Sequence, residues 1–149
     1  MAANESYMRL ALELAQEAEQ QGEVPVGAVV VIDNKVVGQG YNQTILLSDP
    51  TAHAEVIALR QAAKRVGNYR LNGAHLYSTL EPCPMCAGAL VHARIEKLFF
   101  AASDPRTGAC VSQFQLINHS ALNHKVVHEQ GLFAMESADL LRSFFKKRR

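Results

Sequence analysis

One histidine and two cysteines stand at spacings that suit a metal site. His53 forms a His-x-Glu pair with Glu55, and Cys83 and Cys86 follow in a Pro-Cys-x-x-Cys segment. Cysteines three positions apart on a helix share one face, so both thiolates can reach one zinc ion at about 2.3 Å. A helix N-terminus also favours the thiolate, which is the form that binds metals. We therefore expect His53, Cys83 and Cys86 to bind zinc.

The same residues predict hydrolytic chemistry. Three protein ligands leave one tetrahedral position open, as in catalytic zinc sites, where zinc lowers the pKa of water from about 15.7 to about 7. Because residues two apart do not share a helical face, Glu55 is expected to face this water instead of binding the metal. Glu55 can then take a proton and deliver it to a leaving amine, a role typically worth about 10²–10⁴-fold in rate.

Two other interpretations of the cysteine pair stay open. A Cys-x-x-Cys pair can be a redox couple, although Pro84 and Met85 between the cysteines and the nearby His-x-Glu pair favour metal binding. A structural zinc site would need a fourth protein ligand. The residues able to supply one are His75, His92, His119, His124, His128 and Cys110. Otherwise we expect Cys110 to be a small core or loop residue.

The elements that must position these residues alternate between helix and strand. Apolar residues at three- and four-residue spacing, with Gly22 and Gly67 as stops, predict the first two helices. Helices are predicted over Glu5–Gln20, Ala52–Val66, Pro84–His92 and Ser137–Lys147, with a short helix around Ser112–Ile117 in the long connection Ser103–Asn123. Apolar and β-branched runs predict strands over Val26–Ile32, Lys35–Tyr41, Ala74–Thr79, Lys97–Ala101 and Lys125–His128.

This order predicts an α/β fold with helices on both faces of the sheet. Asp33 and Asn34 suit a two-residue turn, so the first two strands form an antiparallel hairpin and the sheet is mixed. Ligand sites in such sheets gather where the chain leaves the strand ends. Both metal-ligand segments are predicted to lie at such junctions.

The composition is that of one ordinary globular domain. The chain has 149 residues, 48% hydrophobic and 19% charged, which excludes disordered and collagen-like chains. Apolar runs such as Val24–Ile32 are too short for a membrane span of about 20 residues, and Met1–Arg9 lacks the pattern of a secretory signal. Three cysteines, an odd count, argue against a disulfide framework. We expect a single domain over residues 1–149 in the cytoplasm.

Positive charge gathers at the end of the chain. Fifteen Lys and Arg against 14 Asp and Glu give a net charge of +1. Four of the basic residues are Lys146, Lys147, Arg148 and Arg149, so the rest carries 11 basic against 14 acidic residues, or −3. Such a tail suits phosphates, and a solvated helix end explains it equally well.

Six segments carry a family resemblance. They are Glu23–Ala28, Tyr41–Asn42, Asp49–Glu55, Glu81–Ala89, Ser103–Ala109 and Phe144–Arg149. The His-x-Glu and Pro-Cys-x-x-Cys motifs are similar to those of the zinc-dependent cytidine and deoxycytidylate deaminase superfamily. With the other segments, the chain resembles the bacterial tRNA-specific adenosine deaminases of that superfamily over nearly its whole length.

This resemblance implies a three-layer α/β/α sandwich with a mixed five-stranded sheet, a homodimer, and one zinc ion per chain. It implies hydrolytic deamination of the wobble adenosine in a tRNA anticodon loop to inosine, with release of ammonia. A base inside a paired stack cannot reach a buried zinc, so an unpaired loop suits such a site. Deamination of a free base or nucleotide, such as cytosine, guanine or deoxycytidylate, is the alternative. A non-enzymatic zinc or RNA-binding module is a third interpretation.

The resemblance also implies residue roles. His53, Cys83 and Cys86 bind zinc and Glu55 carries the proton, as their types and spacing already predict. By the motifs they match, Asn42 contacts the target nucleotide, Asp104 lies in the pocket for the anticodon loop, and Phe145 and the basic tail contact the loop or its phosphates. Turn-forming roles for Asn42 and Asp104 stay open as alternatives.

Overall fold

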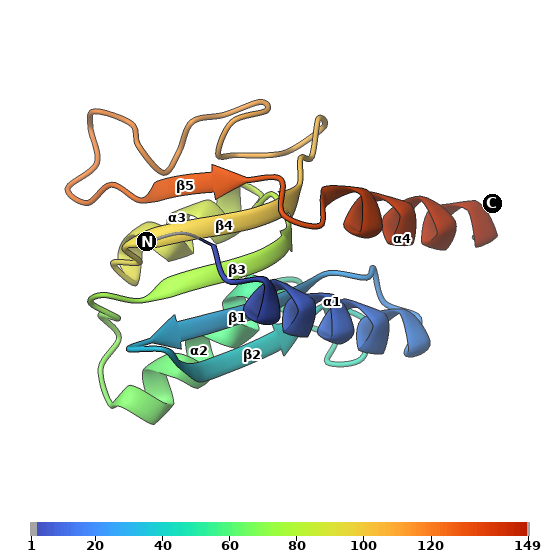
Figure 1. Ribbon diagram of the computed structural model, residues 1–149, viewed down its shortest axis with the longest axis horizontal. Coiled ribbons are helices and arrows are strands. Elements are labelled where there is room, and N and C mark those ends of the chain that lie inside the picture. The colour runs from blue at the N-terminus through green and yellow to red at the C-terminus, as the bar shows by residue number, and fades with distance from the viewer. Residues whose placement is uncertain (1–2, 149) are drawn as a thin grey trace.

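The computed structural model describes residues 3–148 and has three layers (Figure 1). A five-stranded sheet lies between α1 (Glu5–Gln20) on one face and α2 (Ala54–Val66) with α3 (Pro84–His92) on the other. The last helix, α4 (Ala134–Lys147), runs beside α1 and projects past the sheet. The predicted α/β/α sandwich is confirmed.

The sheet is mixed, as predicted. Its strands are β1 (Gly27–Ile32), β2 (Lys35–Tyr41), β3 (His75–Leu80), β4 (Lys97–Ala102) and β5 (Val127–Gln130). They lie in the order β2-β1-β3-β4-β5. β1 is antiparallel to β2 and to β3, whereas β3, β4 and β5 are parallel. Positive φ angles at Asp33 and Asn34 form the predicted hairpin turn between β1 and β2.

Both faces of the central strands are buried, which explains their continuous apolar sequences. Alternate residues of a strand point to opposite faces of the sheet. Val30 and Phe100 pack in the core beneath α2 and α3, whereas Val29 and Phe99 pack in the core beneath α1. Because both faces of these strands are covered, the side chains that could meet a substrate lie beyond their ends.

Four strands, β2 to β5, end at the same edge of the sheet, and three of them lead directly into the candidate site segments. β2 and β3 are both antiparallel to β1, so they run in one direction, and β4 runs parallel to β3. The residues that follow their carboxyl ends are Asn42, Glu81 and Ser103. We call this edge the site edge, because crevices at the carboxyl ends of strands are the usual ligand sites of open α/β sheets.

Two glycines let α2 lie directly against β2. A Cβ atom at Gly40 would overlap the carbonyl oxygen of Ala54, and one at Gly38 would overlap that of Ala58. Only glycine permits so close an approach of helix and strand. The first turn of α2 is thereby held next to the end of β2, where Asn42 follows.

The short helix predicted around Ser112–Ile117 is wrong. The chain forms turns and bends there. The backbone N–H groups of Val111 and Ser112 donate to the carboxylate of Glu81 at 2.8 and 3.0 Å. The N–H groups at the start of a helix have no partner within it, so these bonds alone would permit one. The N–H groups of Gln113 and Leu116, however, donate to the carbonyl oxygens of Gly108 and Ala109 at 2.9 Å each and not to the carbonyls four residues earlier, so no helix forms.

The last two elements also differ from prediction. β5 lies two residues later than predicted, and α4 begins at Ala134 instead of Ser137. Phe133, the N-cap residue of α4, has a φ of 60°, and the Arg9 guanidinium lies 4.7 Å from the centre of its ring. The Ser137 hydroxyl donates to the carbonyl oxygen of Thr79. Contacts with α1 and β3 therefore set the start of this helix.

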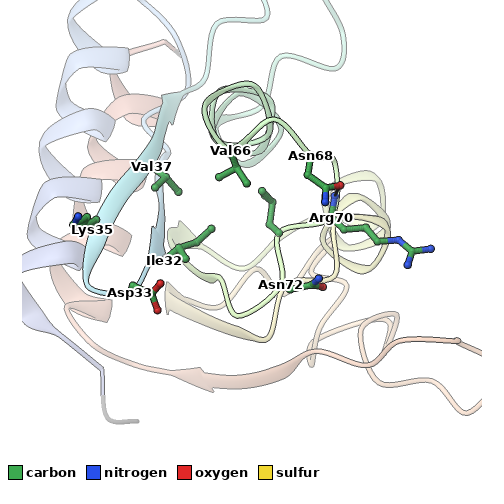
Figure 2. A pocket seen from close by; sticks show the side chains of 9 residues that line it. Ile32, Asp33, Lys35, Val37, Val66, Asn68, Arg70 and Asn72 are labelled. Atoms are coloured by element: carbon green, nitrogen blue, oxygen red, sulfur yellow. Dashed lines mark hydrogen bonds between the residues drawn. The ribbon is translucent and has the colours of Figure 1, made fainter.

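The opposite edge of the sheet carries a hollow of about 430 Å³ (Figure 2). Figure 2 shows Ile32 of β1, Val37 of β2 and Val66 at the end of α2 around it. None of the predicted site residues lines this hollow. Within residues 3–148 no helix combines the length and the apolar character that crossing a bilayer requires.

Candidate metal and catalytic site

The three predicted ligand atoms lie together at the site edge. Nδ1 of His53 lies 3.6 Å from Sγ of Cys83 and 3.5 Å from Sγ of Cys86. All three atoms lie within 4.8 Å of one another. A tetrahedral zinc ion, about 2.3 Å from sulfur and about 2.0–2.1 Å from nitrogen, needs such atoms about 3.6 Å apart. Both the donor types and their separations therefore fit zinc.

Both ligand segments lie at helix N-termini. His53 is the N-cap residue of α2 and Cys83 that of α3, and both have extended backbone angles. Pro84 stands in the first turn of α3, where its missing N–H costs no hydrogen bond, and Cys86 follows in the same turn. The positive ends of two helix dipoles thus meet at the ligand atoms, where they stabilise thiolates.

The two thiols have opposite pKa shifts. A hydrogen bond from Cys86 lowers the pKa of the Cys83 thiol to about 4, and His53 adds to this effect. Donation to Cys83, together with burial, raises the pKa of Cys86. One thiolate therefore forms readily, and the proton of Cys86 must leave when a metal binds.

Glu55 stands beside the ligand group and is not part of it. It lies in the first turn of α2 with only 4% of its surface exposed. Burial raises the pKa of its carboxyl to about 7, and the negative charge of Cys83 acts in the same direction. Glu55 thus lies outside the ligand group, as its spacing predicts, and its contact with the reacting water stays a prediction.

Within residues 3–148 no fourth His, Cys, Asp or Glu joins the ligand group. His75 pairs with Glu96 at 2.9 Å, and His124 contacts the carbonyl oxygen of Ile95 at 2.7 Å. Cys110 is buried in the core, as predicted, and burial raises the pKa of its thiol. Three ligands without a fourth are the arrangement of a catalytic zinc site.

Asn42 adjoins the site and caps the helix that carries it. Its Oδ1 accepts a hydrogen bond from the backbone N–H of Ala54 at 2.8 Å. An N–H group can only donate, so the oxygen must face the helix and the amide nitrogen Nδ2 must face away from it. His53, the N-cap residue, makes no side-chain cap, and Asn42 caps α2 in its place. The hydrogens of the Asn42 amide point away from the helix.

Asp104 closes a turn just after β4. Its Oδ1 accepts from the N–H groups of Arg106 and Thr107 at 3.0 and 3.3 Å, and its Oδ2 accepts from the Thr107 hydroxyl at 3.1 Å. Its own backbone N–H donates to Oε1 of Glu81 at 3.1 Å. The turn-forming interpretation of Asp104 is therefore confirmed, and its contact with a substrate stays a prediction.

Phe145 lies near the end of α4. The residue is 49% exposed, and its ring packs edge-on against Phe144, with 5.3 Å between ring centres. Figure 1 shows α4 projecting beyond the site edge. In the basic tail, Arg148 donates to the carbonyl oxygen of Gly22 at 3.2 Å and covers the Phe144 ring. Lys146 and Lys147 are exposed, and Arg149 lies outside the described residues.

The chain matches known deaminases over most of its length. Residues 1–102 match the cytidine and deoxycytidylate deaminase zinc-binding region. The tRNA-specific adenosine deaminase of Haemophilus influenzae is 52% identical over 147 residues, which are 98% of this chain and 85% of that protein. The chain belongs to the tRNA-specific adenosine deaminase family.

Solved structures agree with this membership of the tRNA-specific adenosine deaminase family. A tRNA:A34 deaminase, studied for A-to-I editing at the wobble position of transfer RNA, superposes with a TM-score of 0.90 and 43% identity. The superposition covers 93% of this chain and 100% of the solved chain. Guanine deaminase from Bacillus subtilis is 34% identical and superposes less well, with a TM-score of 0.65 over 99% of this chain and 94% of that one.

Two buried carboxylates of this family member were not predicted from the sequence. Glu23 and Glu81 are each 1% exposed. Glu23 accepts from the backbone N–H groups of Ile45 and Leu46 at 3.2 and 2.7 Å, and so holds the loop between β2 and α2. Glu81 holds the loop after β4. The sequence feature that could have indicated them is a single acidic residue next to an apolar strand. Because a carboxylate is rarely buried without partners, such a residue predicts a site where several hydrogen-bond donors meet.

Proposed function

We propose that this protein hydrolyses the wobble adenosine of a tRNA anticodon loop to inosine and releases ammonia. The observation that carries the proposal is the set of His53 Nδ1 and two cysteine sulfurs at zinc-site separations, with buried Glu55 beside them. Membership of the tRNA-specific adenosine deaminase family supports the same reaction. The balanced reaction adds one water to adenosine and yields inosine and ammonia.

The site favours an unpaired base. The ligand atoms lie at a sheet edge between two helix N-termini, and Glu55 is buried. A base in a paired stack cannot reach such a position without leaving the stack. Bases of an anticodon loop are already unpaired and can splay out at low cost.

His53, Cys83 and Cys86 are the residues that would hold zinc, one ion per chain. The chemistry supplied by zinc at such a site is the activation of water. Glu55 takes the proton from the attacking water and delivers protons to the purine ring and to the departing amino group. Burial keeps bulk water from the carboxyl and raises its pKa.

The remaining assignments belong to the same proposal. Asp104 and the exposed ring of Phe145 contact the anticodon loop, and the exposed Lys146 and Lys147 contact its phosphates. The protein works as a single domain in a homodimer in the cytoplasm. These assignments rest on the family resemblance and on side-chain exposure.

The direct test compares an anticodon stem-loop with free compounds. We expect ammonia from the stem-loop, and inosine at the wobble position that reverse transcription reads as guanosine. The same loop annealed to a complementary strand should react far more slowly, since its adenosine is then stacked and paired. Ammonia released only from guanine, cytosine or deoxycytidylate would contradict the proposal and favour the free-base alternative.

Substitutions at Asn42 should separate its two roles. Asn42→Asp keeps the acceptor for the Ala54 N–H but loses the amide donors, so kcat/KM for the stem-loop should fall by about 10–100-fold. Asn42→Ala removes the cap as well and should also lower stability by about 1 kcal/mol. Thermal melting and steady-state kinetics provide both readouts.

A neighbouring charge change controls for electrostatics at this position. Gln43→Glu adds the same negative charge one residue along the chain and should affect kcat/KM less than Asn42→Asp does. Wild-type kinetics in Asn42→Asp would show that the amide nitrogen does not contact the substrate.

A further inference from the structure

We propose that Glu81 is a positioning residue that locks the loop after β4 to the metal-ligand segment and thereby aims Asp104 at the substrate. This inference rests on the proposed function, which places Asp104 against the anticodon loop. Glu81 is only 1% exposed, so its carboxylate acts through the loop and does not itself contact RNA.

The Glu81 carboxylate collects five hydrogen bonds from one loop. Its Oε2 accepts from the backbone N–H groups of Cys110, Val111 and Ser112 at 3.1, 2.8 and 3.0 Å. Its Oε1 accepts from the Asp104 N–H at 3.1 Å and from the Ser112 hydroxyl. Residue 104 and residues 110–112 of the loop are therefore bound to one side chain.

The backbone around Glu81 joins the same parts of the site. Its own N–H donates to the carbonyl oxygen of Ala102 at 2.8 Å, which links the ends of β3 and β4. The N–H of Ala109 donates to the carbonyl oxygen of Pro82 at 2.8 Å, one residue before the ligand Cys83. A displacement of the loop would consequently displace the ligand segment, and a displacement of the ligand segment would displace the loop.

Packing leaves the loop little freedom. A Cβ atom at Gly108 would overlap the Glu81 carboxyl group and the carbonyl oxygen of Asp104. The Gly108 N–H donates to that same carbonyl oxygen at 2.9 Å. The turn 104–108 is thus pressed against the carboxylate, and a buried carboxylate with five donors is rigid.

Glutamine at position 81 should cut one of these connections selectively. Its single carbonyl oxygen can face the three N–H groups of 110–112, and its NH₂ then faces the Ser112 hydroxyl and the Asp104 N–H. The hydroxyl can turn and accept, whereas the Asp104 N–H cannot. Glu81→Gln therefore releases Asp104 while 110–112 stay bound.

The test measures kinetics, coupling and amide protection together. In Glu81→Gln we expect KM for the anticodon stem-loop to rise about tenfold, with kcat and bound zinc nearly unchanged. In a double-mutant cycle, adding Glu81→Gln to Asp104→Asn should raise KM by no more than about a further twofold. By NMR hydrogen exchange, the Asp104 amide should lose protection and the amides of 110–112 should keep it.

Two further variants complete the design. Glu96→Gln makes the same chemical change at the opposite edge of the sheet, where Glu96 pairs with His75, and should leave KM unchanged. Ser112→Ala removes a single donor to Oε1 and should raise KM about threefold. If Glu81→Gln does not fold, a double-mutant cycle of Ser112→Ala with Asp104→Asn tests whether Glu81 positions Asp104.

The outcomes distinguish the two proposals. Unchanged KM in both Glu81→Gln and Ser112→Ala, full additivity with Asp104→Asn, or a fall in kcat that follows loss of zinc would overturn the role of Glu81. If the wild-type protein does not deaminate the stem-loop, the proposed function fails. Hydrogen exchange at Asp104 then still tests the connection itself.

Discussion

Replacing Glu55 by glutamine is expected to lower kcat for the anticodon stem-loop by about 10²–10⁴-fold. Glutamine keeps the shape of the side chain but neither accepts nor delivers a proton in the reaction. Because Glu55 is not among the three ligand residues, zinc content should stay at the wild-type level. Single-turnover kinetics and metal analysis of the same preparation provide the measurement.

Stability separates this effect from misfolding. Burying a neutral amide costs less than burying a carboxylate, so the melting temperature of Glu55→Gln should not fall. Glu13→Gln, on the exposed face of α1, is a matched control and should react like the wild type. Undiminished turnover in Glu55→Gln, with zinc retained, would refute its role as the proton carrier.

Removing the metal is the second change with a large expected effect. Chelation should abolish deamination, and adding zinc back should restore it, because water activation depends on the bound ion. A ligand that binds only the folded chain stabilises it by about 4.1 kcal/mol at 1,000 times its Kd. The apo-protein should therefore melt roughly 8–16 °C lower yet stay folded, since the two apolar cores do not include the ligand atoms of His53 and Cys83.

Cysteine variants localise this requirement. Cys83→Ala should lose both zinc and activity, because two ligands remain. Cys110→Ala is the matched control: its thiol lies in the core, and zinc should be retained. Zinc binding by Cys83→Ala, or its loss from Cys110→Ala, would contradict the ligand assignment.

Local signals suffice for most of the secondary structure. The predicted bounds of α1, β2 and α3 match the structure residue for residue, because periodicity, turn residues and a starting proline act within a few residues. The segment from Ser112 to Ile117 shows the limit of such signals. Its pattern resembles a short helix, but the N–H groups of Gln113 and Leu116 donate to the carbonyl oxygens of Gly108 and Ala109, in a segment whose preceding amides are held by Glu81, about 30 positions earlier in the chain.

The chemistry of the site could also be predicted from spacing. Two cysteines three apart at a helix start must share a face, and a histidine one residue before a helix can join them. The family resemblance added Asn42 and Asp104, and in the structure Oδ1 of each accepts a hydrogen bond from a backbone N–H. The Asp104 contact reaches only two residues along the chain and is the turn-forming alternative, whereas the contact of Asn42 with Ala54 is not visible in the local sequence pattern.

By itself, then, the sequence determined the ligand types, their helix-start positions and the family, because each of these depends on neighbouring residues. Only the tertiary structure decided that Asn42 caps α2, and that Glu23 and Glu81 each hold a loop. The physical reason is that these groups accept hydrogen bonds from donors 12 to 31 residues away along the chain, so strand order and burial determine their partners. A buried carboxylate needs several donors at once, and only the folded sheet edge brings them together.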